Sequence, residues 1–200
     1  MATTHIAFVL DRSGSMGSIR RETVDVFNQQ LEKARGSTDR VTLVTFSFTP
    51  DVPRFIGVND KLAVEDYVPA GGTALYDAIG ETVTMLQAVE QSDPDTSYLV
   101  IIITDGEENA STKYGRDSLS SLIKELQATD KWTFAYLGTK QDIFTINQTL
   151  GIPLGNATQF ARDTVADVYR TSNIMASGVA CYNDARGRGA TCSVNFFSNQ

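Results

Sequence analysis

Short apolar runs alternate with segments of helical periodicity along nearly the whole chain, and this alternation constrains the fold more than any other feature. The strongest run, residues 98–104, reads Tyr-Leu-Val-Ile-Ile-Ile-Thr, and residues 5–10 form a similar run near the start. Continuous apolar runs of this length are typical of strands buried on both faces of a parallel sheet. The alternation therefore predicts an α/β fold, a doubly wound and mostly parallel sheet with helices on both faces.

The predicted elements follow one another with short polar connections. We expect strands at residues 5–10, 41–48, 54–58, 98–104, 132–137 and 153–160. We expect helices at residues 18–34, 74–90, 117–128, 139–150 and 163–179. Gly36 and Ser37 are expected to end the first helix, and Thr139 with Asp142 has the spacing of a capping box.

Charge and histidine content exclude several classes of function. The 200 residues include 17 Lys and Arg against 24 Asp and Glu, which gives a formal net charge of -7. Phosphates repel an acidic surface, so we expect neither a nucleic-acid partner nor an anionic membrane partner. The single histidine, His5, excludes zinc sites that need several imidazoles, and its place at the start of a strand suggests a structural role.

The termini bear on the expected location of the protein. No basic segment precedes the first apolar run, and no apolar run approaches the length of a membrane span. Cys181 and Cys192 are most simply two free thiols in a reducing compartment. We therefore expect a cytoplasmic protein.

Polar residues that follow or precede these elements form the candidate site. Asp11, Ser13 and Ser15 come after the first strand, Asp105 comes after the strongest strand, and Thr73 precedes the second helix. In an open α/β sheet, ligands bind at the carboxyl ends of the strands, where the strand order reverses. Ser and Asp also cap helices, but capping does not explain why Thr73 and Asp105 arrive at the same edge.

The donor atoms of this set are all hard oxygens, from carboxylates and hydroxyls. Such oxygens suit Mg²⁺, with Mn²⁺ or Ca²⁺ as substitutes, better than zinc or copper. Gly14 and Gly17 are expected to give the first loop unusual dihedrals, and Gly71 and Gly72 to bring the Thr73 hydroxyl close. A magnesium ion with few protein ligands keeps open positions that attract an outside anion, most simply a carboxylate.

Three motifs in register resemble one known family. Asp11-Arg-Ser13-Gly-Ser15 is similar to the D-x-S-x-S signature of von Willebrand factor A (vWA) domains, including stand-alone bacterial ones. Gly71-Gly72-Thr73 and Thr104-Asp105-Gly106 resemble the other two segments of that family's metal-ion-dependent adhesion site (MIDAS). The resemblance implies a Rossmann-like vWA fold. It also implies that hydroxyls at Ser13, Ser15 and Thr73 hold a metal ion.

The resemblance also implies how the site is used. In the family, the carboxylates at the positions of Asp11 and Asp105 act through water or through hydrogen bonds to the metal-binding groups. The usual partner is a protein that donates a Glu or Asp carboxylate to the metal, with no catalytic step. The last helix shifts in some members when a ligand binds.

The resemblance covers most of the chain. We expect residues 1–180 to form the vWA domain and residues 181–200 to be a C-terminal tail that packs on the domain or extends it. Two other functions stay open: a metal-dependent phosphoryl-transfer enzyme, and a structural vWA protein whose metal site is unused. The enzyme would use Asp11 as nucleophile and needs a second carboxylate two residues later, where this chain has Ser13.

Several charged residues have simple structural interpretations. We expect Glu107 and Glu108 to lie in a solvated loop and Asp77 to complement the dipole in the first turn of its helix. We expect Arg186 and Arg188, which lie between glycines, to belong to a flexible tail.

Overall fold

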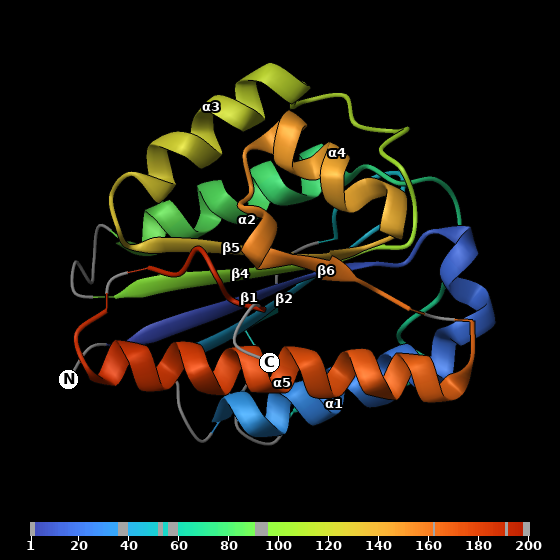
Figure 1. Ribbon diagram of the computed structural model, residues 1–200. Helices are drawn as coiled ribbons and strands as arrows, with labels where there is room; N and C mark the ends of the chain where they lie inside the picture. Colours follow the sequence, from blue (N-terminus) through green and yellow to red (C-terminus); the bar gives the residue numbers. More distant parts are fainter. Residues whose placement is uncertain are drawn as a thin grey trace.

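The structure is a computed structural model that describes residues 3–35, 40–51, 54–55, 60–90, 96–161, 163–190 and 192–197. Strands and helices alternate through the described residues (Figure 1). The strands are β1 (Thr4–Asp11), β2 (Arg40–Phe46), β3 (Arg54–Phe55), β4 (Ser97–Ile103), β5 (Trp132–Gly138) and β6 (Ala157–Gln159). The α-helices are α1 (Arg20–Arg35), α2 (Leu75–Glu90), α3 (Arg116–Gln127), α4 (Lys140–Leu150) and α5 (Val165–Gly187), and the 3₁₀ helices are η1 (Gly14–Ile19) and η2 (Leu154–Asn156).

The strands form one sheet in the order β3-β2-β1-β4-β5-β6. Five neighbouring strands are parallel, and β3 pairs antiparallel with β2 at one edge. The chain moves outward from β1 through β2 to β3 and then returns to place β4 on the other side of β1. The strand order thus reverses between β1 and β4, and this confirms the predicted doubly wound, Rossmann-like α/β fold.

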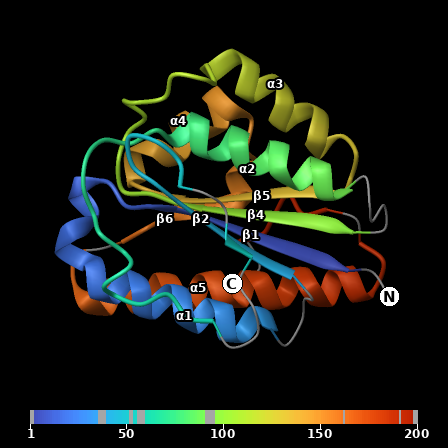
Figure 2. The same cartoon turned by 180° about the vertical axis from the view of Figure 1, so that it is seen from behind.

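Helices cover both faces of the sheet. α1 and α5 pack on one face, while α2, α3 and α4 pack on the other, as Figures 1 and 2 show from opposite sides. Alternate residues of β1 point to the two layers: Phe8 lies in the core with α1 and α5, and Val9 in the core with α2. Central strands buried on both faces account for the unbroken apolar runs of the sequence.

Most predicted boundaries agree with the structure. One exception is the predicted strand at residues 153–160, which is the 3₁₀ helix η2 followed by the short strand β6. A second exception follows β1. The predicted loop after β1 contains the 3₁₀ helix η1, which leads directly into α1 at Arg20 instead of Ser18. The predicted capping box at the start of α4 is confirmed, because the side chains of Thr139 and Asp142 each accept from the other's backbone N–H. The predicted C-cap at Gly36 and Ser37 lies outside the described residues, and so does the end of the predicted strand, residues 56–58.

Helix α5 continues to Gly187, beyond the predicted end at residue 179, so the expected domain boundary at 180/181 falls inside it. Tyr182 is buried past that point, and its ring centroid lies 6.3 Å from that of Phe196. Gly178 allows this approach, because an ideal Cβ there would lie 2.6 Å from the Phe196 ring. The periodicity is hard to read because small or polar residues occupy several buried positions of the helix.

The expectation of a flexible tail at Arg186 and Arg188 is wrong. Arg186 lies in α5, and Arg188 forms an ion pair of 2.6 Å with Asp184 one turn earlier. Asp184 and Arg188 are four residues apart, a spacing at which opposite charges stabilise a helix. This ion pair favours a helical conformation at the end of α5.

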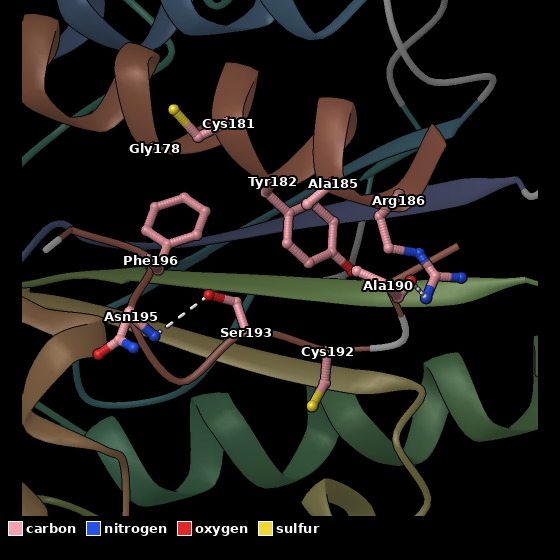
Figure 3. Close-up of a pocket in the computed structure, with 10 residues that line it drawn as sticks. All are labelled: Gly178, Cys181, Tyr182, Ala185, Arg186, Ala190, Cys192, Ser193, Asn195 and Phe196. Carbon is pink, nitrogen blue, oxygen red and sulfur yellow. Dashed lines mark hydrogen bonds between the residues drawn. The ribbon is translucent and has the colours of Figure 1, made fainter. Parts of the chain in front are cut away.

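The segment after α5 packs back onto the domain. Phe196 is buried, and its N–H donates to Oδ1 of Asn156 at 2.8 Å. The Asn156 amide in turn donates to the Ser193 carbonyl at 2.7 Å. Figure 3 shows the small pocket between α5 and this segment, with Cys181 and Cys192 on different sides of it. Both cysteines are free thiols.

Among the helices of the described residues, none combines the length and the apolar character that crossing a bilayer requires.

Candidate metal centre

Three loops meet at the carboxyl ends of β1 and β4. Asp11 is the last residue of β1, and the register pairs Leu10 with Ile103, so Thr104 and Asp105 follow at the same edge. Thr73 lies just before α2. Asp11, Thr73 and Asp105 are all buried, which is unusual for the carboxylates of Asp11 and Asp105.

Hydrogen bonds join the loop after β1 to the loop after β4. The Ser13 N–H donates to Oδ1 of Asp11 at 2.6 Å, and the Thr104 hydroxyl donates to Oδ2 of Asp11 at 2.7 Å. The Ser15 hydroxyl donates to Oδ1 of Asp105 at 2.6 Å, and the two serine Oγ atoms lie 3.1 Å apart. Four of the five predicted residues are therefore in direct contact.

Thr73 joins this group through the space beside Gly106. An ideal Cβ on Gly106 would lie 3.0 Å from Oγ1 of Thr73 and 3.9 Å from both Oδ2 of Asp11 and Oγ of Ser13. The three oxygens thus converge on one side of the Gly106 backbone. The structure brings together all five residues predicted from the sequence.

Backbone hydrogen bonds hold the Gly-Gly-Thr segment against the other two loops. The Gly14 N–H donates to the Gly71 carbonyl at 3.1 Å, and the Asn109 N–H donates to the Thr73 carbonyl at 3.0 Å. The Thr73 N–H donates in return to Oδ1 of Asn109 at 2.9 Å. Gly71 adopts a φ of 78°, a left-handed conformation that favours glycine. Gly14 and Gly17, for which unusual dihedrals were expected, are not among the described residues with positive φ.

A capping role does not explain Ser13. It occupies the N-cap position of η1, but its side chain makes no capping hydrogen bond. Its hydroxyl instead lies beside Ser15, as described above.

Burial raises the pKa of Asp11, and the nearby charge of Asp105 raises it further, while hydrogen bonds from Thr104 and Ser13 oppose the rise. Two buried carboxylates in such proximity repel each other, and a cation between them relieves that repulsion. The electrostatics of the site therefore favour a bound cation.

Two further contacts fix the loop after β1. The Tyr67 hydroxyl donates to the Asp11 carbonyl, and burial raises the pKa of Tyr67, so it remains a neutral donor. Arg12 donates two hydrogen bonds of 2.7 Å to the carboxylate of Asp51, in the loop between β2 and β3. Sequence reasoning missed these residues, because no local pattern links positions so far apart.

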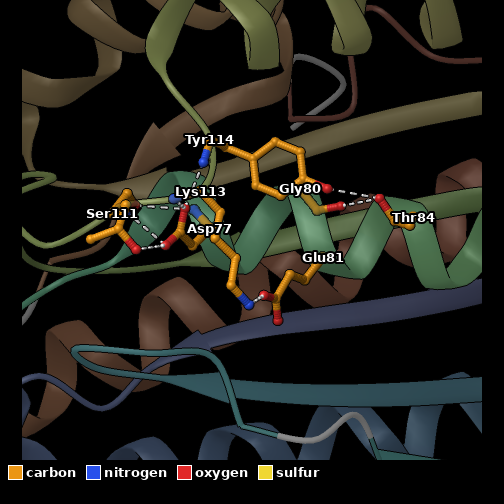
Figure 4. Close-up of polar contacts among 8 residues, drawn as sticks. Asp77, Gly80, Glu81, Thr84, Ser111, Lys113 and Tyr114 are labelled. Atoms are coloured by element: carbon orange, nitrogen blue, oxygen red, sulfur yellow. Dashed lines mark hydrogen bonds and ion pairs between the residues drawn. The ribbon is translucent and has the colours of Figure 1, made fainter.

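The carboxylates of Asp77 and Glu108 hold the loop after β4. The sequence alone predicts a simpler role for each of them. Asp77 lies in the first turn of α2, but its oxygens accept the backbone N–H groups of Thr112, Lys113 and Tyr114 at 2.8–2.9 Å (Figure 4). Burial opposes ionisation of Asp77, yet these three donors lower its pKa below the usual value. Asp77 therefore anchors the loop to the helix.

The expectation that Glu108 is solvated is wrong. Its carboxylate accepts the N–H groups of Tyr76, at the start of α2, and of Ala110 and Ser111 in its own loop, at 2.7–2.9 Å. Glu107 is exposed, in agreement with the expectation. The free N–H groups at a helix start attract a carboxylate, and this accounts for the position of Glu108.

The atoms that could bind a metal at this edge are hydroxyl and carboxylate oxygens. Among the described residues, no three His, Cys, Asp or Glu side chains come together as a group able to hold a metal. A metal at this edge therefore depends on hydroxyl oxygens beside the two carboxylates, which is what the three loops present. Such a set suits a hard dication.

Comparison with protein families identifies the class of this domain. The model of the von Willebrand factor type A domain matches residues 5–154, so the chain belongs to that family. A comparison with curated protein sequences finds no match.

Solved structures with the same fold share little sequence with the chain. Proximal thread matrix protein 1 from the mussel byssus is 16% identical with a TM-score of 0.65, over 90% of this chain and 48% of that one. The pilus adhesin SpaC from Lactobacillus rhamnosus GG is 15% identical with a TM-score of 0.67, over 90% of this chain and 30% of that one. Manganese-loaded TRAP protein from Plasmodium vivax is 16% identical with a TM-score of 0.54, over 84% of this chain and 72% of that one.

The chain thus spans about half the length of the mussel protein and less than a third of the adhesin. A further structure of the mussel protein, with a TM-score of 0.63, is described with zinc in its MIDAS motif.

Proposed function

We propose that this domain is a protein-binding module that holds a divalent metal ion and recognises a carboxylate of its partner through that ion. The observation that carries the proposal is the convergence of hydroxyl and carboxylate oxygens from three loops at the carboxyl edge of the sheet. Ser13, Ser15 and Thr73 would hold the ion with their hydroxyls, and Asp11 and Asp105 would balance its charge.

The hydrogen bonds described above support this division of roles. Ser15 donates its proton to Asp105, so its oxygen can act as an electron-pair donor toward a cation. A carboxylate that accepts from a ligand in this way also orients it and increases its basicity. Both acids are thereby positioned to act through hydrogen bonds to the metal-binding hydroxyls.

The same chemistry favours Mg²⁺, with Mn²⁺ or Ca²⁺ as substitutes, because all the donors are hard oxygens. The manganese in the TRAP structure and the zinc in the mussel structure belong to those proteins. They make a divalent ion at this motif a reasonable proposal here. A bound ion supplies an open coordination position for a Glu or Asp of the partner.

A non-catalytic role fits the site better than phosphoryl transfer. The enzyme alternative needs a carboxylic acid two residues after Asp11, and that position is Ser13, whose hydroxyl lies beside Ser15. A phosphatase assay with generic phosphate esters tests this part of the proposal. Turnover that Asp11→Asn abolishes would favour the enzyme.

Calorimetry with Mg²⁺, Mn²⁺, Ca²⁺ and Zn²⁺ tests the metal site directly. We expect one binding site in the wild type and its loss in Asp11→Ala. Asp117→Ala is the matched control, because the Asp117 side chain is 92% exposed on α3. No binding in the wild type, or equal binding in both variants, would overturn the proposal and favour a structural protein with an unused site.

Affinity capture with the immobilised domain tests the partner. We expect proteins retained in Mg²⁺ to be released by EDTA and not to bind Asp11→Ala. Retention that is insensitive to both the chelator and the substitution would contradict recognition through a metal. The cytoplasmic location stays a prediction.

A further inference from the structure

A second cavity opens beside the proposed metal centre. It has a volume of about 280 Å³ and lies between the start of α2, the loop after β4 and helix α4. Gly106 lines it and also lies against Oγ1 of Thr73, so the cavity begins where the metal centre ends. Its volume is just below the range of typical small-molecule sites, which suits a single side chain.

The charged residues in the wall all have one sign. Glu107, Glu108 and Asp142 line the cavity, and none of its lining residues is basic. Arg116, whose charge acts on Tyr76, does not line the cavity and pairs with Asp117 at 3.2 Å. A concave wall of one charge sign concentrates ions of the opposite sign.

Glu107 and Tyr136 are two groups of the wall that can meet an occupant. Glu107 is exposed, and the structure gives its carboxylate no hydrogen bond or ion pair within the described residues. Tyr136 also lines the cavity, and only 1% of it is exposed, yet its hydroxyl has no hydrogen-bond partner in the described part of the chain. The Tyr136 hydroxyl is not one of the fully enclosed, unpartnered oxygens of the described residues, so it borders the cavity, where an occupant can form a hydrogen bond with it.

The Tyr136 ring reaches this position because β5 ends in a glycine. An ideal Cβ on Gly138 would lie 2.5 Å from the Tyr136 hydroxyl oxygen, so any larger residue would displace the ring tip. Burial raises the pKa of Tyr136, and the charges of Asp142 and Asp11 raise it further. The hydroxyl is therefore neutral and available to accept a hydrogen bond from a cation.

The chemistry of the wall favours an organic cation. The wall combines carboxylates with the rings of Tyr76 and Tyr136 and the aliphatic side chains of Leu75 and Ile146. A guanidinium group pairs with carboxylates, donates several hydrogen bonds and stacks on aromatic rings, while its stem packs on apolar surface.

We propose that this cavity receives an arginine side chain of the partner protein, next to the acidic residue that the metal centre receives. The inference rests on the proposed function and specifies its partner: a motif with an acidic residue and a nearby arginine. Glu107 would pair with the guanidinium, and the Tyr136 hydroxyl would accept one of its hydrogen bonds.

The cavity is tested first without metal or partner. Ethylguanidinium is titrated while the methyl NMR signals of Leu75 and Ile146 are followed, with Leu31, in the opposite core layer, as the reference. We expect saturable shifts in the wild type, about tenfold weaker binding in Glu107→Gln, and an intermediate loss in Tyr136→Phe. Glu125→Gln, an exposed α3 variant outside the cavity, is the matched control. Shifts that are linear, or that equal those caused by sodium chloride, would overturn the proposal.

The second test joins the two sites. Fluorescein-labelled peptides that carry one Glu and one Arg, separated by glycine spacers of different length, are titrated with the domain in saturating Mg²⁺. We expect the best spacer to bind about tenfold more tightly than its citrulline analogue, and the advantage to disappear in Glu107→Gln. Glu-dependent binding without an arginine advantage would overturn the cavity assignment alone. If replacing Glu with Gln in the peptide changes nothing, the proposed metal-dependent function itself fails.

Discussion

His5 and Asp11 lie near opposite ends of β1, and both side chains are completely buried. At the amino end, Nε2 of His5 lies 2.8 Å from the Thr42 hydroxyl, and the ring packs 6.0 Å from that of Tyr98. At the carboxyl end, Asp11 accepts from Ser13 and Thr104 and faces a second carboxylate, Asp105.

The two ends of β1 differ in whether they contain buried charge. Burial, together with the positive charge of Arg40, lowers the pKa of His5 to about 4, so the amino end remains neutral at physiological pH. The carboxyl end gathers two acids and several hydroxyls in three loops. The domain thus keeps charge out of the end where only packing is needed, and it concentrates charge at the end where we propose that a cation binds.

The largest expected contrast is in metal affinity. Asp11→Asn removes one of the two acids and should weaken Mn²⁺ binding about a thousandfold, or ~4 kcal/mol, because the remaining ligands no longer balance the ion's charge. His5→Gln, at the other end of the same strand, should leave the affinity within about a factor of two. Isothermal titration calorimetry measures both, and a similar loss in both variants would remove the distinction between the ends.

The next contrast is in the pH dependence of stability. The folded pKa of His5 is lower than the unfolded value of 6.5, so the unfolded chain binds the proton first as the pH falls. Stability should therefore fall between pH 6.5 and about 4, and the wild type should lose about 2.5 kcal/mol more than His5→Gln between pH 7 and pH 4.5.

Urea unfolding at several pH values measures this difference. Glutamine can still hydrogen-bond to Thr42, so the variant isolates the titration from the loss of a contact. Parallel pH profiles for the two proteins would show that His5 titrates normally in the fold.

A smaller effect is expected from Gly106→Ala. The added methyl would lie 3.0 Å from Oγ1 of Thr73 and push this hydroxyl away from the other oxygens. We expect about a tenfold loss of Mn²⁺ affinity with little change in melting temperature. Gly187→Ala, where a Cβ meets no atom within 4 Å, is the control and should change neither quantity appreciably. Unchanged affinity in Gly106→Ala would mean that Thr73 is not a ligand.

The smallest effect is expected from Asn109→Ala, which removes the acceptor for the Thr73 N–H. A single hydrogen bond of this kind is worth about 1 kcal/mol, so metal affinity should fall by no more than about fivefold. Asn109→Asp keeps an acceptor oxygen and should restore most of the affinity. A loss in Asn109→Ala as large as that in Asp11→Asn would make Asn109 part of the metal centre itself.

Local patterns were sufficient for the order of elements and for the residues of the candidate site. The apolar runs predicted β1 and β4 because both strands are buried on two faces, and Thr139 with Asp142 predicted the start of α4 because a capping box is a local contact. The candidate residues were predictable because each lies close to the end of a strand or the start of a helix.

Contacts between segments that are distant in the sequence determined the features that local patterns did not predict. Helix α5 extends past residue 179 because Tyr182 packs on Phe196, and Glu108 leaves solvent because the start of α2 offers it free N–H groups. The cavity depends on Tyr136, whose place is set by Gly138 and by the helices around it.

The sequence by itself determined the alternation of strands and helices, the family, and the five oxygen-bearing residues, because these depend on periodicity and short spacings within one segment. Only the tertiary structure decided which loops touch, which acids are engaged by backbone N–H groups and where a cavity remains. Those outcomes depend on packing between residues far apart in the chain, and such packing leaves no periodic signal in the sequence.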